Sequence, residues 1–285
     1  MSVYKSLPLF FGLCLLFTVN PVSYAKIQIK VDESPINRSS SGVVQSFAPI
    51  LSSSTPAVVS VTTQQIVRRI FPGSRNPIEE FLRRYYGYPD LNQPRVEEVP
   101  VPAGIGSGVI VTPDGYVITN AHVITADQRT GDLVEEVLVK VSEKEEYKAS
   151  IIGFDRTTDI AVLKINAENP LPYVVLGNSE NLQVGDVVFA VGNPLGVGKT
   201  VTMGIISATK KSELGVLGSD GAYESFIQTD ASINPGNSGG ALIDDKGRLL
   251  GVVNVIRSTS GGNQGLNFAI PVDTVIEVFN SIVDK

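Results

Sequence analysis

Three short segments of this sequence contain residue types that can support nucleophilic chemistry. TNAHVI, residues 119–124, holds His122, which is the only histidine of the chain. TDIAVLKI, residues 158–165, has an aspartate before a strongly apolar run, and NPGNSGGAL, residues 234–242, surrounds Ser238 with glycines. A serine hydroxyl is a poor nucleophile near neutral pH and needs a neighbouring base, usually an imidazole. If this chain performs serine chemistry, His122 is the only imidazole that can serve as that base.

Each segment also has a purely structural explanation. A single histidine is more often a surface residue or a hydrogen-bonded core residue than a base. A glycine-rich segment is equally consistent with an ordinary turn between strands and with a loop whose successive N–H groups converge on an anion. In the second case, the glycines at 236, 239 and 240 would let such donors surround Ser238.

An imidazole base needs a third group to orient it, and a carboxylate that accepts its second N–H is the usual solution. Asp155 and Asp159, both in GFDRTTDIAV, are the candidates after His122. Asp159 is favoured because it opens an apolar strand that could hold it buried. Asp155 is interpreted as a turn residue before Arg156.

The elements that must position these residues are mostly short strands. A strand is predicted from about Ala57, and from Gly104 onward about a dozen strands alternate with turns, including a hairpin through the turn signal PDG. A terminal helix is predicted in PVDTVIEVF from its apolar spacing. This pattern predicts β-barrels or a sandwich rather than an α/β sheet.

Alternation fails for some 35 residues before GIGSGVIV, and this gap contains one predicted helix. In NPIEEFLRRYYG the apolar residues fall on one helical face, with Asn76 as the cap and Gly87 as the stop. The flanks FPGSRNP and YPDLNQPRVEEVPVP are typical of loops. The apolar face could contact a neighbouring subunit or pack on its own barrel, and docking on a membrane surface is a distant third interpretation. The face comprises Ile78, Phe81, Leu82, Tyr85 and Tyr86.

The N-terminal residues have the features of a secretory signal, with cleavage expected after Ala25. Residues 26–47 are predicted to be a flexible leader. The apolar run from Leu7 to Val19 is short for an uncleaved bilayer span. Cys14, the only cysteine, lies in that signal, so the mature chain has no disulfide framework and no thiol for a zinc or copper site. We expect no cofactor, and the net charge of −6 argues against nucleic acid as a partner.

The three segments together resemble the catalytic motifs of the HtrA (high-temperature-requirement) family of serine proteases. The resemblance also includes GSGVIVTPDGYVITNAHVI, VGNPLGVGKTVTMGIISA and GLNFAIP, and it runs from about Ala48 to the C-terminus. It implies an all-β fold, a chymotrypsin-like pair of six-stranded β-barrels with a C-terminal helix. The trypsin-like domain would span 48–285. Its expected parts are a first barrel at about 56–167 with an insertion at 64–103, a second barrel at about 171–271 and a helix at 271–284.

The same resemblance implies roles for individual residues. Ser238 would be the nucleophile, His122 the general base and Asp159 the residue that fixes the imidazole tautomer. Backbone N–H groups of Gly236 and Ser238 would form the oxyanion hole. Asn237 stands where digestive relatives carry an aspartate, so activation by cleavage of a pro-segment is not expected.

Further family positions concern specificity and activation. A small or medium aliphatic residue is expected before the scissile bond, in an extended substrate that pairs with the strand lining the specificity pocket. Lys210 and Lys211 occupy the place of a possible basic switch in the activation loop. The expected substrate-binding residues are Ile233, Val253, Asn254, Val255 and Ile256.

The expected function is an ATP-independent endopeptidase of the bacterial envelope, periplasmic or secreted, that cleaves unfolded or damaged proteins. Family analogy implies a homotrimer or a larger homo-oligomer, with no stable membrane span after signal cleavage. No PDZ domain is expected, because the sequence ends at Lys285, shortly after the predicted terminal helix. The alternatives are a chaperone-like binder of unfolded chains with little cleavage, and a narrow processing protease.

Overall fold

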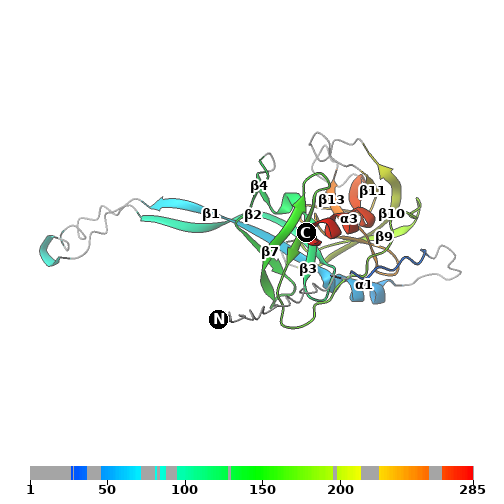
Figure 1. Cartoon of the computed structure of the whole chain (residues 1–285), viewed down its shortest axis with the longest axis horizontal. Coiled ribbons are helices and arrows are strands. Elements are labelled where there is room, and N and C mark those ends of the chain that lie inside the picture. Colours follow the sequence, from blue (N-terminus) through cyan, green and yellow to red (C-terminus); the bar gives the residue numbers. More distant parts are fainter. Residues whose placement is uncertain are drawn as a thin grey trace, which may run out of the picture.

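Two closed six-stranded antiparallel β-barrels and a C-terminal helix make up most of the protein in this computed structural model (Figure 1). The fold class expected from the sequence is therefore confirmed. The structure describes residues 27, 29–36, 46–71, 81, 84–87, 95–127, 130–194, 198–212, 225–256 and 265–284. The expected signal at 1–25 lies outside these residues. No helix in the described part is long and apolar enough to cross a membrane.

The first barrel is closed in the strand order β1-β2-β3-β8-β7-β6. Its interior is filled by branched side chains such as Val61, Val139 and Leu163, none of which is exposed. Strands β4 and β5 form a separate two-stranded sheet. The elements are β1 (Val58–Phe71), β2 (Arg95–Ile110), β3 (Tyr116–Asn120), β4 (Thr125–Asp127), β5 (Asp132–Leu133), β6 (Glu136–Lys140), β7 (Glu146–Asp155) and β8 (Ile160–Lys164).

The second barrel is closed in the order β10-β11-β14-β13-β12-β9 and has its own core. Successive residues of β9 serve two different cores: Val188 and Ala190 pack inside the barrel, and Phe189 packs outside it, 4.8 Å from the Phe47 ring. The helix α1 (Ala48–Ser54) follows Phe47 directly. The strands are β9 (Val187–Gly192), β10 (Thr200–Lys211), β11 (Phe226–Thr229), β12 (Ala241–Ile243), β13 (Leu249–Ile256) and β14 (Asn267–Pro271).

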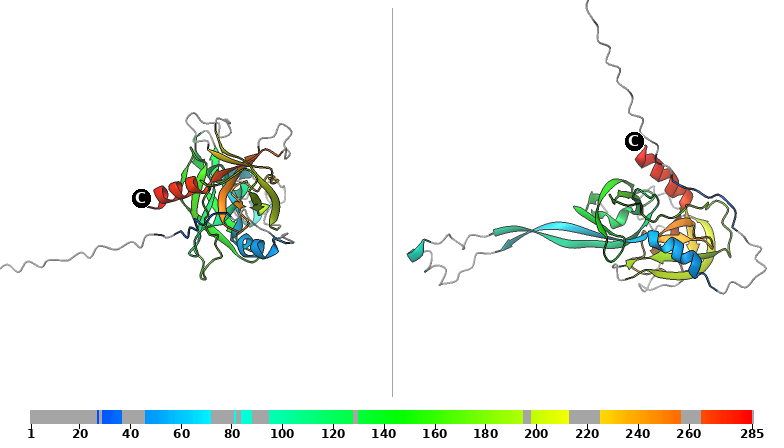
Figure 2. Two further views of the ribbon diagram at one scale, coloured as in Figure 1. Left: turned by 90° about the vertical axis from the view of Figure 1, so that its right-hand side faces the viewer. Right: turned by 90° about the horizontal axis from the view of Figure 1, so that it is seen from below.

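The terminal helix α3 (Val272–Val283) joins the two barrels (Figure 2). It follows β14 of the second barrel directly, and its Phe279 ring lies 5.6 Å from that of Tyr116 in the first barrel. Near its end, Ile282 packs so closely on β7 that a Cβ added to Gly153 would lie 2.7 Å from its Cγ2 atom. The helix therefore fixes how the barrels face each other.

Strands β1 and β2 continue beyond the first barrel as a long ribbon, here called the arm, which comprises the described residues 64–71 and 95–102 (Figures 1 and 2). The expectation of loops at 71–77 and 88–102 is wrong for Phe71 and residues 95–102, because the β1–β2 ladder runs to Phe71 and Arg95. The arm shows little alternation because it exposes both faces. The predicted helix at 76–87 lies largely outside the described residues.

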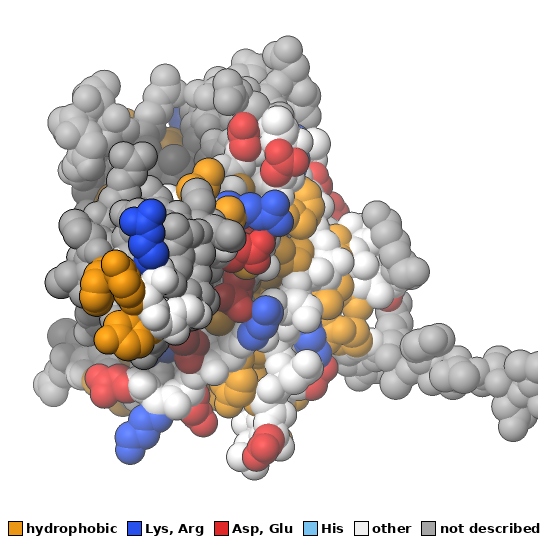
Figure 3. All heavy atoms as spheres, turned by 90° about the vertical axis from the view of Figure 1, so that its left-hand side faces the viewer, with side chains coloured by type: hydrophobic (Ala, Val, Ile, Leu, Met, Phe, Trp, Pro, Cys, Tyr) orange, Lys and Arg blue, Asp and Glu red, His pale blue; other side chains and the backbone are white. Residues whose placement is uncertain are grey.

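Aromatic side chains lie exposed at the end of the arm. Phe81, Tyr85 and Tyr86 are 52%, 70% and 69% exposed. They touch one another rather than a barrel, with 4.7 Å between the ring centroids of Phe81 and Tyr85. This excludes packing on their own barrel for these three residues. Figure 3, viewed from the arm's side of the molecule, shows hydrophobic side chains lying open among charged ones.

Part of the expected flexible leader is attached to the second barrel. Val31 forms a parallel bridge with Leu176, and the Asp32 N–H donates to the Leu176 carbonyl at 2.8 Å. Arg248 is buried and pairs with Asp244 at 2.7 Å, while its Nη1 donates to Ser34 Oγ at 2.8 Å. A buried guanidinium needs partners for its N–H groups. The leader supplies some of them, so the prediction of flexibility is wrong for this portion.

Candidate active site

His122 lies where β3 leaves the first barrel. β3 ends at Asn120, and a single 3₁₀ turn, Ala121–Val123, carries the imidazole. Ala121 and Val123 are buried on either side, whereas the His122 side chain keeps 33% of its surface exposed. The small Ala121 and the end of the strand together hold the ring at the protein surface.

The Asp159 carboxylate binds both the imidazole and the backbone N–H of His122. Its Oδ2 lies 2.7 Å from His122 Nδ1, and its Oδ1 accepts the His122 backbone N–H at 2.8 Å. An ionised carboxylate can only accept hydrogen bonds, so this contact places the proton of a neutral imidazole on Nδ1. The other ring nitrogen, Nε2, is then an acceptor that can take a proton.

Asp159 adopts an unusual backbone conformation, with φ at 57°. Aspartate visits this left-handed region more readily than most residues, and here neighbouring groups stabilise it. The Asp159 carbonyl accepts the Ala121 N–H and the Asn120 Nδ2, each at 3.1 Å. The conformation therefore directs both the carbonyl and the carboxylate of Asp159 towards the TNAHVI segment.

Asn254 of the second barrel also binds this carboxylate. Its Nδ2 donates to Asp159 Oδ2 at 3.0 Å, and both side chains are buried. The pairing of β13 with β14 shifts register between Val253 and Val255, which marks a bulge at Asn254. Bulges redirect a side chain out of the regular alternation. This one places a second-barrel amide on a first-barrel carboxylate.

Ser238 lies in a tight loop before β12. Asn237 N–H donates to Asn234 O at 3.0 Å and closes a four-residue turn, in which Gly236 has φ at 94°. A positive φ at the third position of such a turn is typical of type II and favours glycine. The loop is close-packed, because a Cβ added to Gly236 would lie 2.5 Å from Pro194 Cβ.

The serine loop and the histidine turn meet across β2. The Ser107 N–H donates to the Ser238 carbonyl at 2.7 Å. A Cβ added to Gly106 would lie 3.0 Å from that carbonyl oxygen and 2.8 Å from Val123 Cγ2, next to His122. Only a residue without a side chain fits between the two segments. Thus the structure brings together the three segments from which the sequence analysis started.

Asp155, the other candidate carboxylate, serves a turn at the end of β7. Its Oδ1 accepts the Thr157 N–H at 2.8 Å and the Thr157 hydroxyl at 2.7 Å. The prediction that Asp155 is a turn residue agrees with this geometry.

The expected substrate-binding residues have different surroundings. Ile233 and Val253 lie in the core of the second barrel, 1% and 0% exposed. Asn254 is directed at Asp159, as described above. For Val255 and Ile256 the structure describes the backbone pairing with β14 but not the side chains.

Lys210 and Lys211 lie at the end of β10 rather than in a loop. Lys210 has φ at 54°, in the left-handed region, and Lys211 pairs with Phe226 of β11. The glycine-containing part of the expected activation loop, residues 213–224, lies outside the described residues.

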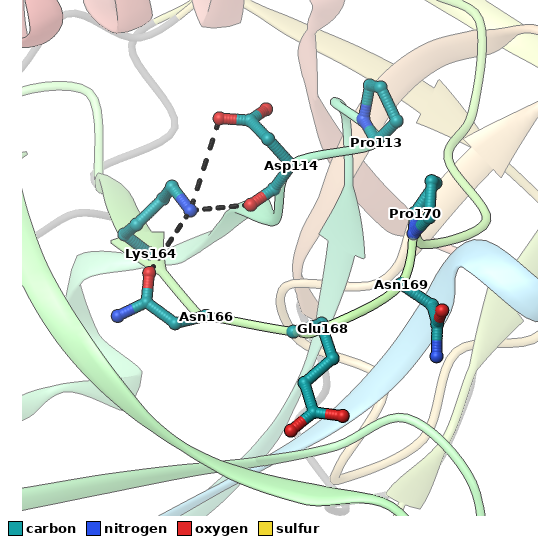
Figure 4. Close-up of a pocket in the computed structure, with 8 residues that line it drawn as sticks. Pro113, Asp114, Lys164, Asn166, Glu168, Asn169 and Pro170 are labelled. Atoms are coloured by element: carbon teal, nitrogen blue, oxygen red, sulfur yellow. Dashed lines mark hydrogen bonds and ion pairs between the residues drawn. The ribbon is translucent and has the colours of Figure 1, made fainter.

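An open pocket of about 360 Å³ lies at the end of the first barrel opposite to His122 (Figure 4). Pairing of β3 with β8 joins Tyr116 to Lys164 at the pocket end and Asn120 to Ile160 at the histidine end. Lys164 Nζ donates to the Ile165 carbonyl at 3.0 Å and lies 4.0 Å from an Asp114 carboxylate oxygen. The lining of this pocket includes the Asp114 and Glu168 carboxylates but no histidine, cysteine or serine.

Two residues at the site make contacts that the sequence does not reveal. The sequence predicts Asn254 as a substrate-binding residue and Ser107 only as part of the strand GIGSGVIV. A serine between two glycines in a barrel strand is a signal for a close approach of backbones. Its partner cannot be found without the tertiary structure.

Comparison with known proteins places the chain in a family. The model of the trypsin-like peptidase domain matches residues 106–252, which include His122, Asp159 and Ser238. Probable periplasmic serine endoproteases of DegP-like type from Chlamydia pneumoniae and Pseudomonas putida (strain ATCC 700007 / DSM 6899 / JCM 31910 / BCRC 17059 / LMG 24140 / F1) are each 40% identical, over 86% and 83% of this chain. The chain spans about half the length of these curated relatives, 50% and 48%.

Solved structures give the same result. The HtrA-type protease AlgW with a decapeptide is 40% identical with a TM-score of 0.66, and the match covers 84% of this chain and 68% of that one. The same protease with a tripeptide is 39% identical with a TM-score of 0.64, covering 84% and 64%. The double barrel, the domain match and these similarities together show that the chain belongs to the HtrA family of trypsin-like serine proteases.

Proposed function

We propose that this chain is an ATP-independent serine endopeptidase of the cell envelope that cleaves unfolded or damaged proteins. The observation that carries the proposal is the 2.7 Å contact between His122 Nδ1 and a buried Asp159 carboxylate, beside the glycine-rich loop of Ser238. A buried carboxylate that orients an exposed imidazole has a clear chemical use next to a serine. A binder that does not cleave would have no need for it.

In the proposed mechanism, Ser238 Oγ attacks the carbonyl carbon of the scissile bond while His122 Nε2 takes its proton. Asp159 keeps Nδ1 protonated and stabilises the imidazolium that forms. The N–H groups of Gly236 and Ser238 donate to the oxyanion of the tetrahedral intermediate, where each such donor is typically worth about 3–4 kcal/mol. The intermediate collapses as His122 returns the proton to the leaving amine, and water then hydrolyses the acyl-enzyme by the same route.

The proposed substrate is an extended segment that pairs with β13. On one side, β13 pairs with β14 up to Ile256. On the other side, pairing with β12 reaches Val252, and among the described residues no strand pairs there with 254–256. This edge can accept a substrate strand, which requires an unfolded chain. A small or medium aliphatic residue before the scissile bond is also part of the proposal; it rests on the family resemblance, since the Ile233 and Val253 side chains are buried in the core of the second barrel.

The envelope location and the quality-control role are also part of the proposal. The supporting observations are the sequence features of residues 1–25 and the similarity to relatives named periplasmic serine endoproteases. The solved HtrA-type relative holds bound peptides, which fits a protease acting on extended chains. We further propose assembly into homotrimers or larger homo-oligomers, and a switching role for Lys210 or Lys211.

The proposal is tested by labelling the mature protein with a fluorophosphonate probe in the presence of casein as an unfolded substrate. We expect labelling at Ser238 and casein fragments detectable by mass spectrometry, and neither with Ser238→Ala. The cleavage sites also give the residue preference. Binding of casein with no labelling and no fragments would instead favour the chaperone-like alternative. Cleavage of one sequence only would favour the narrow processing protease.

A further inference from the structure

Ser107 contacts both residues whose N–H groups are the candidate oxyanion donors. Its hydroxyl donates to the Gly236 carbonyl at 2.7 Å, and its backbone N–H donates to the Ser238 carbonyl at 2.7 Å. Ser107 belongs to β2 of the first barrel, whereas the serine loop belongs to the second. One residue thus holds the loop at two points across the junction of the barrels.

The same hydroxyl holds a third segment. It accepts the Asn193 N–H at 2.9 Å, in the turn after β9 that leads to Pro194. Pro194 in turn supports the serine loop, since a Cβ on Gly236 would lie 2.5 Å from its Cβ. The hydroxyl therefore fixes both Gly236 and the residues against which Gly236 packs.

Ser107 is fully buried, and every polar group of it is used. In addition to the contacts above, its carbonyl accepts the Thr119 hydroxyl at 2.7 Å. Thr119 begins the TNAHVI segment, so the hydrogen-bonded chain continues towards His122. Without the Ser107 hydroxyl, a buried carbonyl and a buried N–H would both lose a partner, and such groups are costly to leave unsatisfied.

Fixed carbonyls determine the direction of N–H groups. A peptide plane is rigid, so holding the carbonyl of Gly236 fixes the plane that it shares with Asn237. Holding the Ser238 carbonyl fixes the plane after the nucleophile. The Ser238 N–H belongs to the single peptide unit between these two fixed planes. The Gly236 N–H lies in the turn closed by the Asn237–Asn234 hydrogen bond, in which Gly236 has φ at 94°. Donors fixed in advance are what stabilise a developing oxyanion best.

We propose that Ser107 is a positioning residue whose buried hydroxyl holds the oxyanion donors of Gly236 and Ser238 in their working directions across the barrel junction. The inference rests on the proposed peptidase function. It predicts that Ser107 acts on the transition state rather than on peptide binding.

The test compares Ser107→Ala with the wild type and with Ser60→Ala. Ser60 faces Ser107 in the β1–β2 ladder and is 1% exposed, and its hydroxyl has no hydrogen-bond partner among the described residues. It is therefore a matched control for removal of a buried serine hydroxyl. Three quantities are measured: kcat and KM on a peptide substrate, affinity for a peptide aldehyde that forms an oxyanion on Ser238, and affinity for the same peptide as a free acid.

For Ser107→Ala we expect kcat to fall about 10- to 100-fold, less than the 10²- to 10³-fold typical of losing a donor outright. Aldehyde affinity should fall in parallel, while KM and the affinity for the free acid stay within about twofold. Ser60→Ala should match the wild type. Unchanged kcat in Ser107→Ala, or equal losses in both variants, or parallel loss of free-acid binding, would overturn the inference.

If Ser107→Ala does not fold, Ser107→Cys is measured instead, because it fills the site with a slightly larger side chain of the same shape that donates only weakly. A lower kcat with weaker aldehyde binding supports the inference, and wild-type values overturn it. Failure of the proposed function looks different, because the wild type itself would then neither hydrolyse the peptide nor react with the aldehyde.

Discussion

In both the inner and the outer half of the β1–β2 ladder these two strands pair with each other, but the surroundings of the two halves differ. In the inner half, up to Thr63 on β1, both strands are part of the closed first barrel, and β2 carries Ser107 to the serine loop. In the outer half, the same two strands form the arm, with Val67 41% and Ile70 70% exposed. A register shift between Thr63 and Gln64 marks the boundary.

This difference shows that backbone pairing alone does not define a functional site. β6 pairs with β1 only from Ser60 to Gln64, and the core side chains of β1, Val58, Val59 and Val61, all lie before Gln64. Where a core exists, side chains are buried and most polar groups find partners, as those of Ser107 do, whereas the buried Ser60 hydroxyl has none among the described residues. On the arm, water satisfies the same groups. Sequence changes should therefore act on chemistry and stability in the inner half and on surface contacts in the outer half.

The largest effect should come from the base beside the inner half. His122→Ala should lower kcat by about 10⁴- to 10⁶-fold, because no other imidazole can activate Ser238. The fold should remain intact, since the His122 side chain is 33% exposed. Peptide hydrolysis and circular dichroism measure the two effects. Retention of more than about one hundredth of the activity would contradict the assigned base.

Two valines on β1, one in each half of the ladder, should differ in how much they contribute to the free energy of unfolding. Val61 is 0% exposed in the barrel core, and Val67 is 41% exposed on the arm. We expect Val61→Ala to lower the free energy of unfolding by about 2 kcal/mol, because it leaves a cavity. Val67→Ala should cost less than about 0.5 kcal/mol. Urea denaturation measures both, and equal losses would refute the division at Thr63.

Asn254→Ala tests the hydrogen bond that joins the two barrels at Asp159. The variant loses the amide that donates to Asp159 Oδ2 at 3.0 Å, and we expect kcat to fall about tenfold through a less constrained imidazole. Asn267→Ala is the control, because this buried amide of the same barrel donates to the Ala231 carbonyl instead. Both should lose about 1 kcal/mol of stability. A similar kcat for the two variants would show that the contact with Asp159 has no effect on turnover.

The smallest effect on catalysis should come from the arm. Replacing residues 76–87, at the end of the arm, by a short Gly-Ser linker should leave hydrolysis of a short peptide within about twofold, because the exposed Phe81, Tyr85 and Tyr86 do not pack on a barrel. We expect the assembly to become smaller, since exposed Phe81, Tyr85 and Tyr86 are suited to contact another subunit. Sedimentation velocity measures the assembly mass. An unchanged mass would contradict this role for the aromatic residues at the end of the arm.

Much of the fold could be predicted from the sequence because local signals coincide with barrel geometry. The turn signal PDG does join β2 to β3, where Gly115 has φ at 101°. Alternation in β6 gives an alternating burial pattern. The arm could not be predicted in this way, because alternation arises only where one face of a strand is buried. Likewise, the sequence predicts a flexible leader at 31–34, because the partner that holds it, Arg248, is more than 200 residues away in the chain.

The sequence by itself determined which residues could do chemistry: one imidazole, one serine among glycines and an aspartate before an apolar strand. Those identities follow from composition and side-chain chemistry, which are local properties. The tertiary structure alone decided that Asn254 supports Asp159 and that Ser107 supports Gly236 and Ser238. Both contacts cross between barrels, and hydrogen bonds between such distant segments depend on barrel closure and a bulge, which no local pattern encodes.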